Sequence, residues 1–414
     1  MSFPGGYRPG MPRTLSPVAA IPRSGIRTLM ELALRDPLAI RLEVGEPDVA
    51  TPEHVIAAAA RDARAGHTGY SSSTGLAELR AALASKVTSG TGRVTSPDEV
   101  VVTHGAMHGI AMALQCALAP GEQVLLPDPE FPNWRMAAVA AGLDVGTYPV
   151  RAAAGFVPVV LEVERSVTER TRAIVVCSPN NPTGAVYPRE VLEGLVDVAR
   201  RHDLWILSDE CYEDFAFDAP HQGLTELDPD GRVMSFFSFS KSHAMTGWRV
   251  GYAVVPDPTV RELMGHLAEA TVSCPSTIGQ RAALAALAGP RDHVVAARDA
   301  YRARRDAAVD LLSARGIGCV RPEGAFYLMV DVSAATSDSE AFALRLLARR
   351  HVAVAPGSTF GDGARGMVRV SLAAGRDVLL EGLGRLADEV QEWEGGPQAA
   401  RAGLAADTAA AATA

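Results

Sequence analysis

The sequence predicts an α/β protein with two parts, a larger one built on a mostly parallel sheet and a smaller α+β one. Three observations lead to this prediction. Between residues 99 and 255, short β-branched runs alternate with helical patterns, which is typical of a sheet with helices on both faces. After Gly289-Pro290 this alternation is replaced by one long helical pattern. The chain, at 414 residues, is also too long for one simple core.

The larger part is expected to contain the strand-like runs 99–103, 123–127, 173–179, 205–210, 233–240 and 250–255. Helical patterns separate these runs. One of them, 188–203, opens with a proline suited to a first helical turn. Open α/β sheets bind ligands at the C-terminal ends of their strands, so residues that directly follow these runs are candidates for a site.

The smaller part is expected to begin with one long amphipathic helix over 291–316. Two further strand-like runs, FYLMVDV and MVRVSLA, follow it, with a helix-like stretch between them. We therefore expect a large domain over 51–290 and a small domain over 25–50 and 291–394. Five prolines predict an extended N-terminal arm over 1–24, and the Ala-rich end predicts a disordered tail over 395–414.

Composition excludes several classes of protein. The net charge of −9 and the lack of a basic run argue against a nucleic-acid partner. No 18-residue apolar run occurs, so no membrane span is expected. The five cysteines lie far apart without CxxC spacing, which predicts no metal site and reduced thiols in a cytoplasmic protein.

Lysine is rare among the 39 basic residues, of which only two are lysines, Lys86 and Lys241, and the others are arginines. Arginine serves a salt bridge or a phosphate contact at least as well as lysine. One task that arginine cannot perform is to lose its proton and attack a carbonyl, forming an imine. Lys241, in SFSKSHAMTGWRVG after a strand-like run, is therefore a candidate nucleophile.

Other polar residues follow the ends of the expected strands. A glycine turn at Gly105 opens a helix, where backbone N–H groups suit an anion, although such turns are common. SPNNPTG presents amide side chains, and SDECY presents Asp209, which on its own could equally be a helix cap. Ser238 and Arg249 flank Lys241 and suit a phosphate. Dinucleotide and nucleoside triphosphate motifs are absent from the sequence.

SPNNPTG, SDECY, the spaced SFSKSHAMTGWRVG motif and VRVSLA occur in this order. Together they resemble the fold-type I, pyridoxal-phosphate-dependent aminotransferases of class I/II, the aspartate-aminotransferase-like group. The resemblance runs from about Gly25 to about Ala374. It implies a large domain with a mostly parallel seven-stranded sheet, a smaller α+β domain, and a homodimer. It also implies ping-pong transfer of an amino group from an amino acid to a 2-oxo acid.

The resemblance assigns a role to each motif. Lys241 would bind pyridoxal phosphate covalently and move the substrate's α-proton, and Asp209 would pair with the pyridine nitrogen. Tyr212 and Asn181 would hydrogen-bond the phenolic oxygen of the ring. The phosphate would be held by Gly105, Ala106, Met107, Ser238, Ser240 and Arg249.

Two aromatic residues complete the implied cofactor site. Phe131, in PDPEFPNW, would stack on the ring where the family usually has tyrosine or tryptophan. Tyr70 matches a tyrosine that reaches the phosphate of the neighbouring subunit, which implies two shared sites in a homodimer.

The implied substrate site begins with Arg369, which would clamp the α-carboxylate with help from the Gly45 N–H and Asn181. Ile26 would cover the substrate side chain, or would simply pack in the core. At the position of Met107, some aspartate-specific relatives have a lysine that meets the distal carboxylate. Methionine there favours an amino acid with a neutral, apolar side chain.

Other functions on the same scaffold remain open at this stage. β-Elimination, cyclopropane formation and amino-acid oxidation use the same cofactor residues. A cofactor-sensing transcription regulator is disfavoured by the acidic balance and by the short stretch before Ser24, where a DNA-binding domain would lie.

Overall fold

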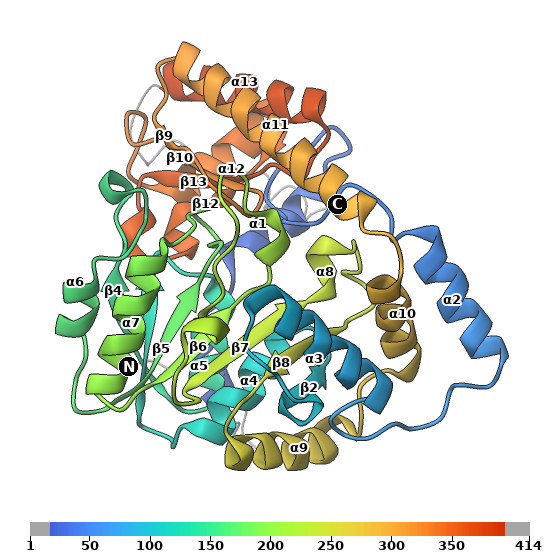
Figure 1. Cartoon of the computed structure of the whole chain (residues 1–414). Coiled ribbons are helices and arrows are strands. Elements are labelled where there is room, and N and C mark those ends of the chain that lie inside the picture. Colours follow the sequence, from blue (N-terminus) through green and yellow to red (C-terminus); the bar gives the residue numbers. More distant parts are fainter. Residues whose placement is uncertain (1–16, 394–414) are drawn as a thin grey trace, which may run out of the picture.

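A computed structural model describes residues 17–393 of the chain. The expected tail over 395–414, and most of the expected N-terminal arm, lie outside these residues. The larger part is a seven-stranded sheet in the order β2-β8-β7-β6-β5-β3-β4 (Figure 1). Its strands are β2 (Val100–Thr103), β3 (Gln123–Asp128), β4 (Asp144–Pro149), β5 (Thr171–Cys177), β6 (Trp205–Asp209), β7 (Val233–Ser238) and β8 (Gly251–Val254).

The sheet is parallel except for β8, which runs antiparallel to both of its neighbours, β7 and β2. The prediction of a mostly parallel seven-stranded sheet is therefore confirmed. Six strands coincide with the runs read from the sequence, and β4 does not. Its sequence, DVGTYP, contains a glycine and ends on a proline. Both residues weaken a strand pattern and are tolerated at a sheet edge, where β4 pairs with β3 alone.

Strand β7 ends two residues earlier than its apolar run suggests. The hydroxyl of Ser238 accepts a hydrogen bond from the backbone N–H of Ser240, which caps the start of α8 (Phe239–Ser242). Lys241 therefore lies on a helical turn directly beyond the strand end.

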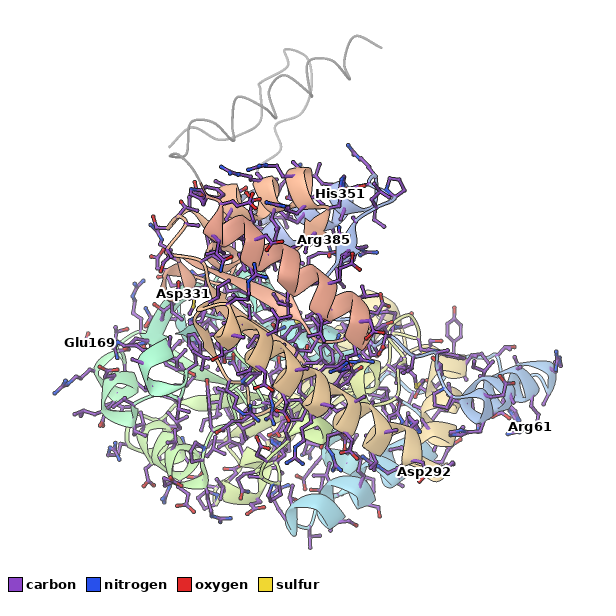
Figure 2. The ribbon with its side chains drawn as sticks, turned by 90° about the horizontal axis from the view of Figure 1, so that it is seen from above. Arg61, Glu169, Asp292, Asp331, His351 and Arg385 are labelled. Carbon is purple, nitrogen blue, oxygen red and sulfur yellow. The ribbon has the colours of Figure 1, made fainter. Side chains whose placement is uncertain are left out.

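Helices cover both faces of the sheet, because alternate strand residues point to opposite sides. One face packs against α4 (Ala106–Ala117), α5 (Pro132–Ala140) and α9 (Pro258–Val272). The other face packs against α6 (Val160–Arg165) and α7 (Arg189–Arg201) toward β4. Toward β2 that same face packs against α2 (Glu53–Arg64), α3 (Ala77–Thr91) and α10 (Thr277–Ala288). Arg61, on α2, stands at the margin of the molecule opposite Glu169 (Figure 2).

The smaller part contains an antiparallel sheet in the order β12-β13-β10-β9. Its strands are β9 (Cys319–Val320), β10 (Tyr327–Asp331), β12 (Ala355–Pro356) and β13 (Met367–Ser371). The long helix α11 (Asp292–Ala314) lies over this region beside α13 (Arg376–Gln391), with α12 (Ser339–Arg350) close to the sheet (Figure 1).

Residues near the N-terminus also belong to this region. Strand β1 (Ile40–Arg41) pairs in parallel with β11 (Val352–Ala353), and α1 (Gly25–Ala33) contributes Leu29 to the same core. This packing joins residues that are more than 300 positions apart, as the pairing of Ile40 with Val352 illustrates. The exact domain boundaries stay a prediction. Within residues 17–393, no helix combines the length and the apolar character that a membrane span requires.

The two parts meet at the end of β3. The backbone N–H of Glu130 donates to the carbonyl of Phe360 at 2.7 Å, and the N–H of Gly363 donates to the Asp128 carboxylate at 2.9 Å. Glu130 is buried there, with one carboxylate oxygen 2.6 Å from Arg135 Nε and the other without a partner. Burial raises the pKa of Glu130 to about 7, although Arg135 opposes the shift.

This carboxyl should make the stability of the protein depend on pH. A folded-state pKa above the ordinary value near 4.5 means that stability is present below pH 4.5 and is lost as the pH rises through 7. Glu130→Gln, which cannot ionise, should therefore gain stability over the wild type as the pH rises, by at most about 3 kcal/mol at pH 8.

Urea unfolding at pH 5, 6, 7 and 8 measures this gain. Glu193→Gln, at an exposed position on α7, controls for the substitution itself. The prediction would be contradicted if the free energies of unfolding of Glu130→Gln and the wild type differed by the same amount at every pH.

Candidate active site

The candidate residues gather at one edge of the large sheet because the strands that precede them are parallel. Cys177, the last residue of β5, lies opposite Asp209 at the end of β6, and Asp209 lies opposite Phe236 in β7. Gly251 pairs with both Ser238 and Thr103, so β8 connects the ends of β7 and β2. The segments after β2, β5, β6 and β7 therefore meet at this edge.

The segment that follows β6 is strongly acidic, with four carboxylates between residues 209 and 214. Three of them have basic partners from other elements. Glu210 lies 2.5 Å from His221, Glu213 lies 2.5 Å from Lys86, and Asp214 pairs with Arg291. These partners neutralise most of the negative charge of the segment.

Asp209 is the fourth carboxylate, and it has no ion pair among residues 17–393. It is buried, and its two oxygens accept hydrogen bonds from Trp134 Nε1 at 3.3 Å and from the Cys211 N–H at 3.2 Å. Burial raises the pKa of Asp209 because it penalises the charged form. A cation placed beside this carboxylate would offset that penalty.

Arg249 is an unpaired cation at the same edge. No carboxylate of the described chain pairs with it, and its Nη1 donates to the Thr246 carbonyl at 2.8 Å. A Cβ added at Gly105 would lie 2.5 Å from Arg249 Nη2, so the guanidinium rests directly against this glycine. Gly105, at φ +76°, immediately precedes α4. A guanidinium beside a helix N-terminus is a suitable site for a phosphate.

Lys241 reaches the N-terminal segment. Its Nζ donates to the Gly45 carbonyl at 2.7 Å and lies 5.7 Å from the centre of the Phe326 ring. It forms no ion pair within the described residues, unlike Lys86. The amine is therefore not engaged by a carboxylate.

Arg369 is a second unpaired guanidinium, and it is only 2 % exposed. It donates to Asn181 Oδ1 at 2.9 Å and to the Glu43 carbonyl at 2.6 Å, while its Nε has no partner. None of the described carboxylates forms an ion pair with it. Such a buried, incompletely bonded guanidinium is suited to a carboxylate supplied by a ligand.

Tyr327 connects these groups and was not predicted from the sequence. Its hydroxyl lies 2.8 Å from that of Tyr212, and its ring lies 4.2 Å below the Arg369 guanidinium. A Cβ at Gly45 would come within 1.8 Å of the Tyr327 hydroxyl, so this position requires glycine. The available signal was the register of FYLMVDV against MVRVSLA, which puts Tyr327 and Arg369 on one face of the small sheet.

Trp134 is a second residue that was not predicted. It lies on α5, three positions after Phe131, and its indole N–H reaches Asp209. Phe360 is a third, because its ring packs 4.8 Å from the Arg369 guanidinium. Trp134 lies 75 positions before Asp209, whereas Phe360 precedes the motif of Arg369 along the chain.

The remaining predicted residues have fewer contacts with the charged groups of the site. Met107 and Phe131 are half-buried against the core on the α4 and α5 face of the sheet. Ile26 is half-buried on α1. Tyr70 is 92 % exposed and contacts none of the predicted phosphate residues of its own chain.

Pyridoxal phosphate fits the charges of this site. Its pyridinium is the cation that the buried Asp209 lacks, and its phosphate is the anion that Arg249 and the start of α4 suit. An amino acid substrate carries the carboxylate that Arg369 lacks. The unpaired charges of Asp209, Arg249 and Arg369 thus each match a group of opposite charge on the cofactor or the substrate.

Comparison with known proteins agrees with this arrangement. A family model, "Aminotransferase class I and II", matches residues 39–384. The aspartate/prephenate aminotransferase of Thermus thermophilus is 41% identical over 354 residues, which are 84% of this chain and 90% of that protein. The arginine–pyruvate transaminase of Pseudomonas aeruginosa is 37% identical over 348 residues, 84% of this chain and 88% of that protein.

Solved structures agree as well. Thermus thermophilus aspartate aminotransferase with maleate has a TM-score of 0.87 and 39% identity, covering 91% of this chain and 99% of that one. The aromatic aminotransferase of Pyrococcus horikoshii has a TM-score of 0.83 and 35% identity, covering 89% of this chain and 99% of that one. The chain therefore belongs to the class I and II aminotransferases, fold-type I enzymes that use pyridoxal phosphate to move an amino group from an amino acid to a 2-oxo acid.

Proposed function

We propose that three unpaired charges, two at the edge of the large sheet and one on β13 of the small sheet, bind the reactants of an amino-group transfer. Asp209 would hold the pyridine nitrogen of the cofactor in its protonated form, and Arg249 would hold the phosphate. Arg369 would bind the α-carboxylate of the amino acid. The observation that carries this proposal is that all three lack an ion pair within residues 17–393, whereas the three acids beside Asp209 each have one.

Further residues would complete the two binding sites. The N–H groups of Ala106 and Met107 at the start of α4, with the hydroxyls of Ser238 and Ser240, would add hydrogen bonds to the phosphate. Tyr212 and Asn181 would meet the phenolic oxygen of the ring. Asn181 also holds Arg369, so it would link the cofactor site to the substrate site.

Lys241 would carry out the proton transfers. When bound, the cofactor supplies an electron sink for the charge that develops at the α-carbon. Lys241 Nζ would anchor the cofactor and then remove the α-proton of the substrate, since no carboxylate within residues 17–393 forms an ion pair with its amine. Removal of Arg369's positive charge would weaken the binding of every substrate with an α-carboxylate.

Lys241→Ala should show no measurable turnover but should still bind pyridoxal phosphate, because Asp209 and Arg249 remain. Absorbance of the purified protein, titrated with the cofactor, and half-reactions with amino acids measure the two properties. Lys241→Arg is the matched control, since it keeps the positive charge but cannot act as a base at neutral pH. Transamination by Lys241→Ala would contradict the assigned role.

We infer that the donor is an amino acid with an uncharged, mostly apolar side chain. Met107 and Phe131 present half-buried apolar side chains beside the proposed phosphate and ring positions. Lysine at the position of Met107 would supply a charge-assisted hydrogen bond to a distal carboxylate, and methionine does not. Relatives named aspartate/prephenate aminotransferases make aspartate the competing donor.

Half-reaction rates for leucine, methionine, phenylalanine, alanine, aspartate and glutamate test this inference, and the neutral amino acids should react fastest. Met107→Lys should raise the relative rate with aspartate roughly ten- to a hundredfold, because a charge-assisted hydrogen bond contributes about 1.5–3 kcal/mol. Met107→Leu is the apolar control. A wild-type rate with aspartate tenfold above every neutral amino acid would show that another cation meets the distal carboxylate.

We propose that two copies of the chain share their active sites. Tyr70 is 92 % exposed and borders an open depression of about 710 Å³ that also includes His104, Pro275 and Thr277. It follows α2, the helix at the margin of the molecule (Figure 2). The backbone carbonyl of His104 accepts a hydrogen bond from Arg249, so the depression adjoins the proposed phosphate site. A tyrosine from a second copy could therefore reach that site.

Mixing two defective variants tests the shared site. In the proposed dimer, each site takes Lys241 from one subunit and Tyr70 from the other. A dimer of one Lys241→Ala chain and one Tyr70→Phe chain should therefore contain one intact site and one doubly defective site. Random pairing should then restore about a quarter of the wild-type sites, measured as transamination at limiting cofactor. Activity no higher than the sum of the separate variants, or a fully active monomer in light scattering, would contradict the proposal.

We also propose a cytoplasmic location. The five cysteines form no disulfide in the described chain, although all of them lie within it. A reducing compartment keeps such thiols free.

A further inference from the structure

Lys86, the second lysine of the chain, is not part of the proposed reaction. It lies on α3, and its side chain is 21 % exposed. Its Nζ donates to Glu213 Oε1 at 2.5 Å and to the Tyr252 hydroxyl at 3.1 Å. Burial opposes the charge on this amine, but Glu213, Tyr252 and Asp214 outweigh burial and raise the pKa of Lys86 above its ordinary value.

Aromatic rings define the space around this ammonium group. Nζ lies 5.4 Å from the centre of the Phe237 ring and 5.8 Å from that of Tyr252, and the two rings are stacked 4.6 Å apart. An ammonium is compact and can donate in three directions, whereas a guanidinium is planar and larger. This geometry explains a lysine at a position where the chain would otherwise use arginine.

The contacts of Lys86 join three segments that carry or adjoin proposed active-site residues. Glu213 directly follows Tyr212, and Phe237 directly precedes Ser238. Tyr252 follows Gly251, whose Cα packs so closely on the start of α4 that a Cβ there would lie 2.7 Å from the Ala106 nitrogen. One ammonium group thus contacts the neighbours of the ring-binding, phosphate-binding and lysine-bearing segments.

We propose that Lys86 is a positioning residue that fixes the Tyr212–Glu213 turn against the end of β7 and so sets the place of the Tyr212 hydroxyl relative to Lys241. This proposal rests on the proposed function, because it assigns Tyr212 to the phenolic oxygen of the cofactor. Without Lys86, the side chain at position 213 would lose the hydrogen bond through Nζ that ties it to Tyr252 and the end of β7, whether that side chain is charged or neutral, and the turn would shift. Tyr212, the neighbour of residue 213 in this turn, would move with it.

The test uses the holoenzyme and four variants: Lys86→Met, Lys86→Arg, the double variant Lys86→Met/Glu213→Gln, and the control Arg80→Met. Arg80 lies on the same helix, but it donates to the Pro97 and Val100 carbonyls at the start of β2, the opposite end from the site. Three quantities are measured: the pH midpoint of the visible absorbance change of the bound cofactor, the steady-state constants, and the unfolding temperature.

Lys86→Met should raise the pH midpoint of the absorbance change of the bound cofactor. The Tyr212 hydroxyl, which would favour the deprotonated form of the cofactor imine, is displaced in this variant. Lys86→Met should also lower kcat about ten- to a hundredfold, as expected for a misplaced group, while KM changes less than about twofold. Lys86→Arg should shift both quantities in the same direction by less. Arg80→Met should lower only the unfolding temperature.

The double variant separates position from charge. The double variant lacks both charges of the Lys86–Glu213 pair, so its net charge is that of the wild type. A change in the pH midpoint that came only from the lost positive charge of Lys86 would therefore disappear, whereas a change that came from a displaced Tyr212 hydroxyl would remain. The double variant also carries the test if Lys86→Met does not fold. Wild-type midpoint and kcat in Lys86→Met, or their return in the double variant, would overturn the proposal. Neither result would affect the proposed function, which fails only if the wild-type enzyme lacks the absorbance or the turnover.

Discussion

The buried carboxylate of Asp209, which lacks an ion pair in the described chain, is the constraint around which the site is organised. Burying a charge without a counter-charge is costly, so its surroundings must stabilise it. Trp134 and the Cys211 N–H supply hydrogen bonds, and the neighbouring acids are neutralised by His221, Lys86 and Arg291. The protein thereby keeps one carboxylate available for a ligand within a strongly acidic segment.

The topology brings the other components to this carboxylate. Parallel strands end at the same edge, and antiparallel β8 brings Gly251 back against the start of α4. The N-terminal segment reaches the same place from the smaller part, where β1 pairs with β11. The Glu43 carbonyl accepts from Arg369 within the smaller part, and the Gly45 carbonyl accepts from Lys241, so the Gly45 oxygen connects the two parts of the molecule at the site.

Much of this arrangement could be predicted from the sequence, and the rest could not for physical reasons. Asp209, Asn181 and Arg249 directly follow or flank strand-like runs, so local patterns locate them. Tyr327 and Trp134 reach the site only through tertiary packing; the pairing register of two separate strands was the signal for Tyr327, and nothing near Trp134 in the sequence marks Asp209 as its partner. Strand β4 was missed because an edge strand tolerates the glycine and proline that its sequence contains.

The scarcity of lysine has a chemical consequence for an enzyme that uses an aldehyde. Pyridoxal phosphate condenses with accessible neutral amines, and a surface rich in lysine would form adducts away from the site. This chain uses arginine at 37 of its 39 basic positions, and guanidinium groups stay protonated. Lys86 is engaged by Glu213, which keeps its amine protonated and unreactive. With the role proposed for Lys241, the composition of the chain would direct the reactive carbonyl to that one side-chain amine.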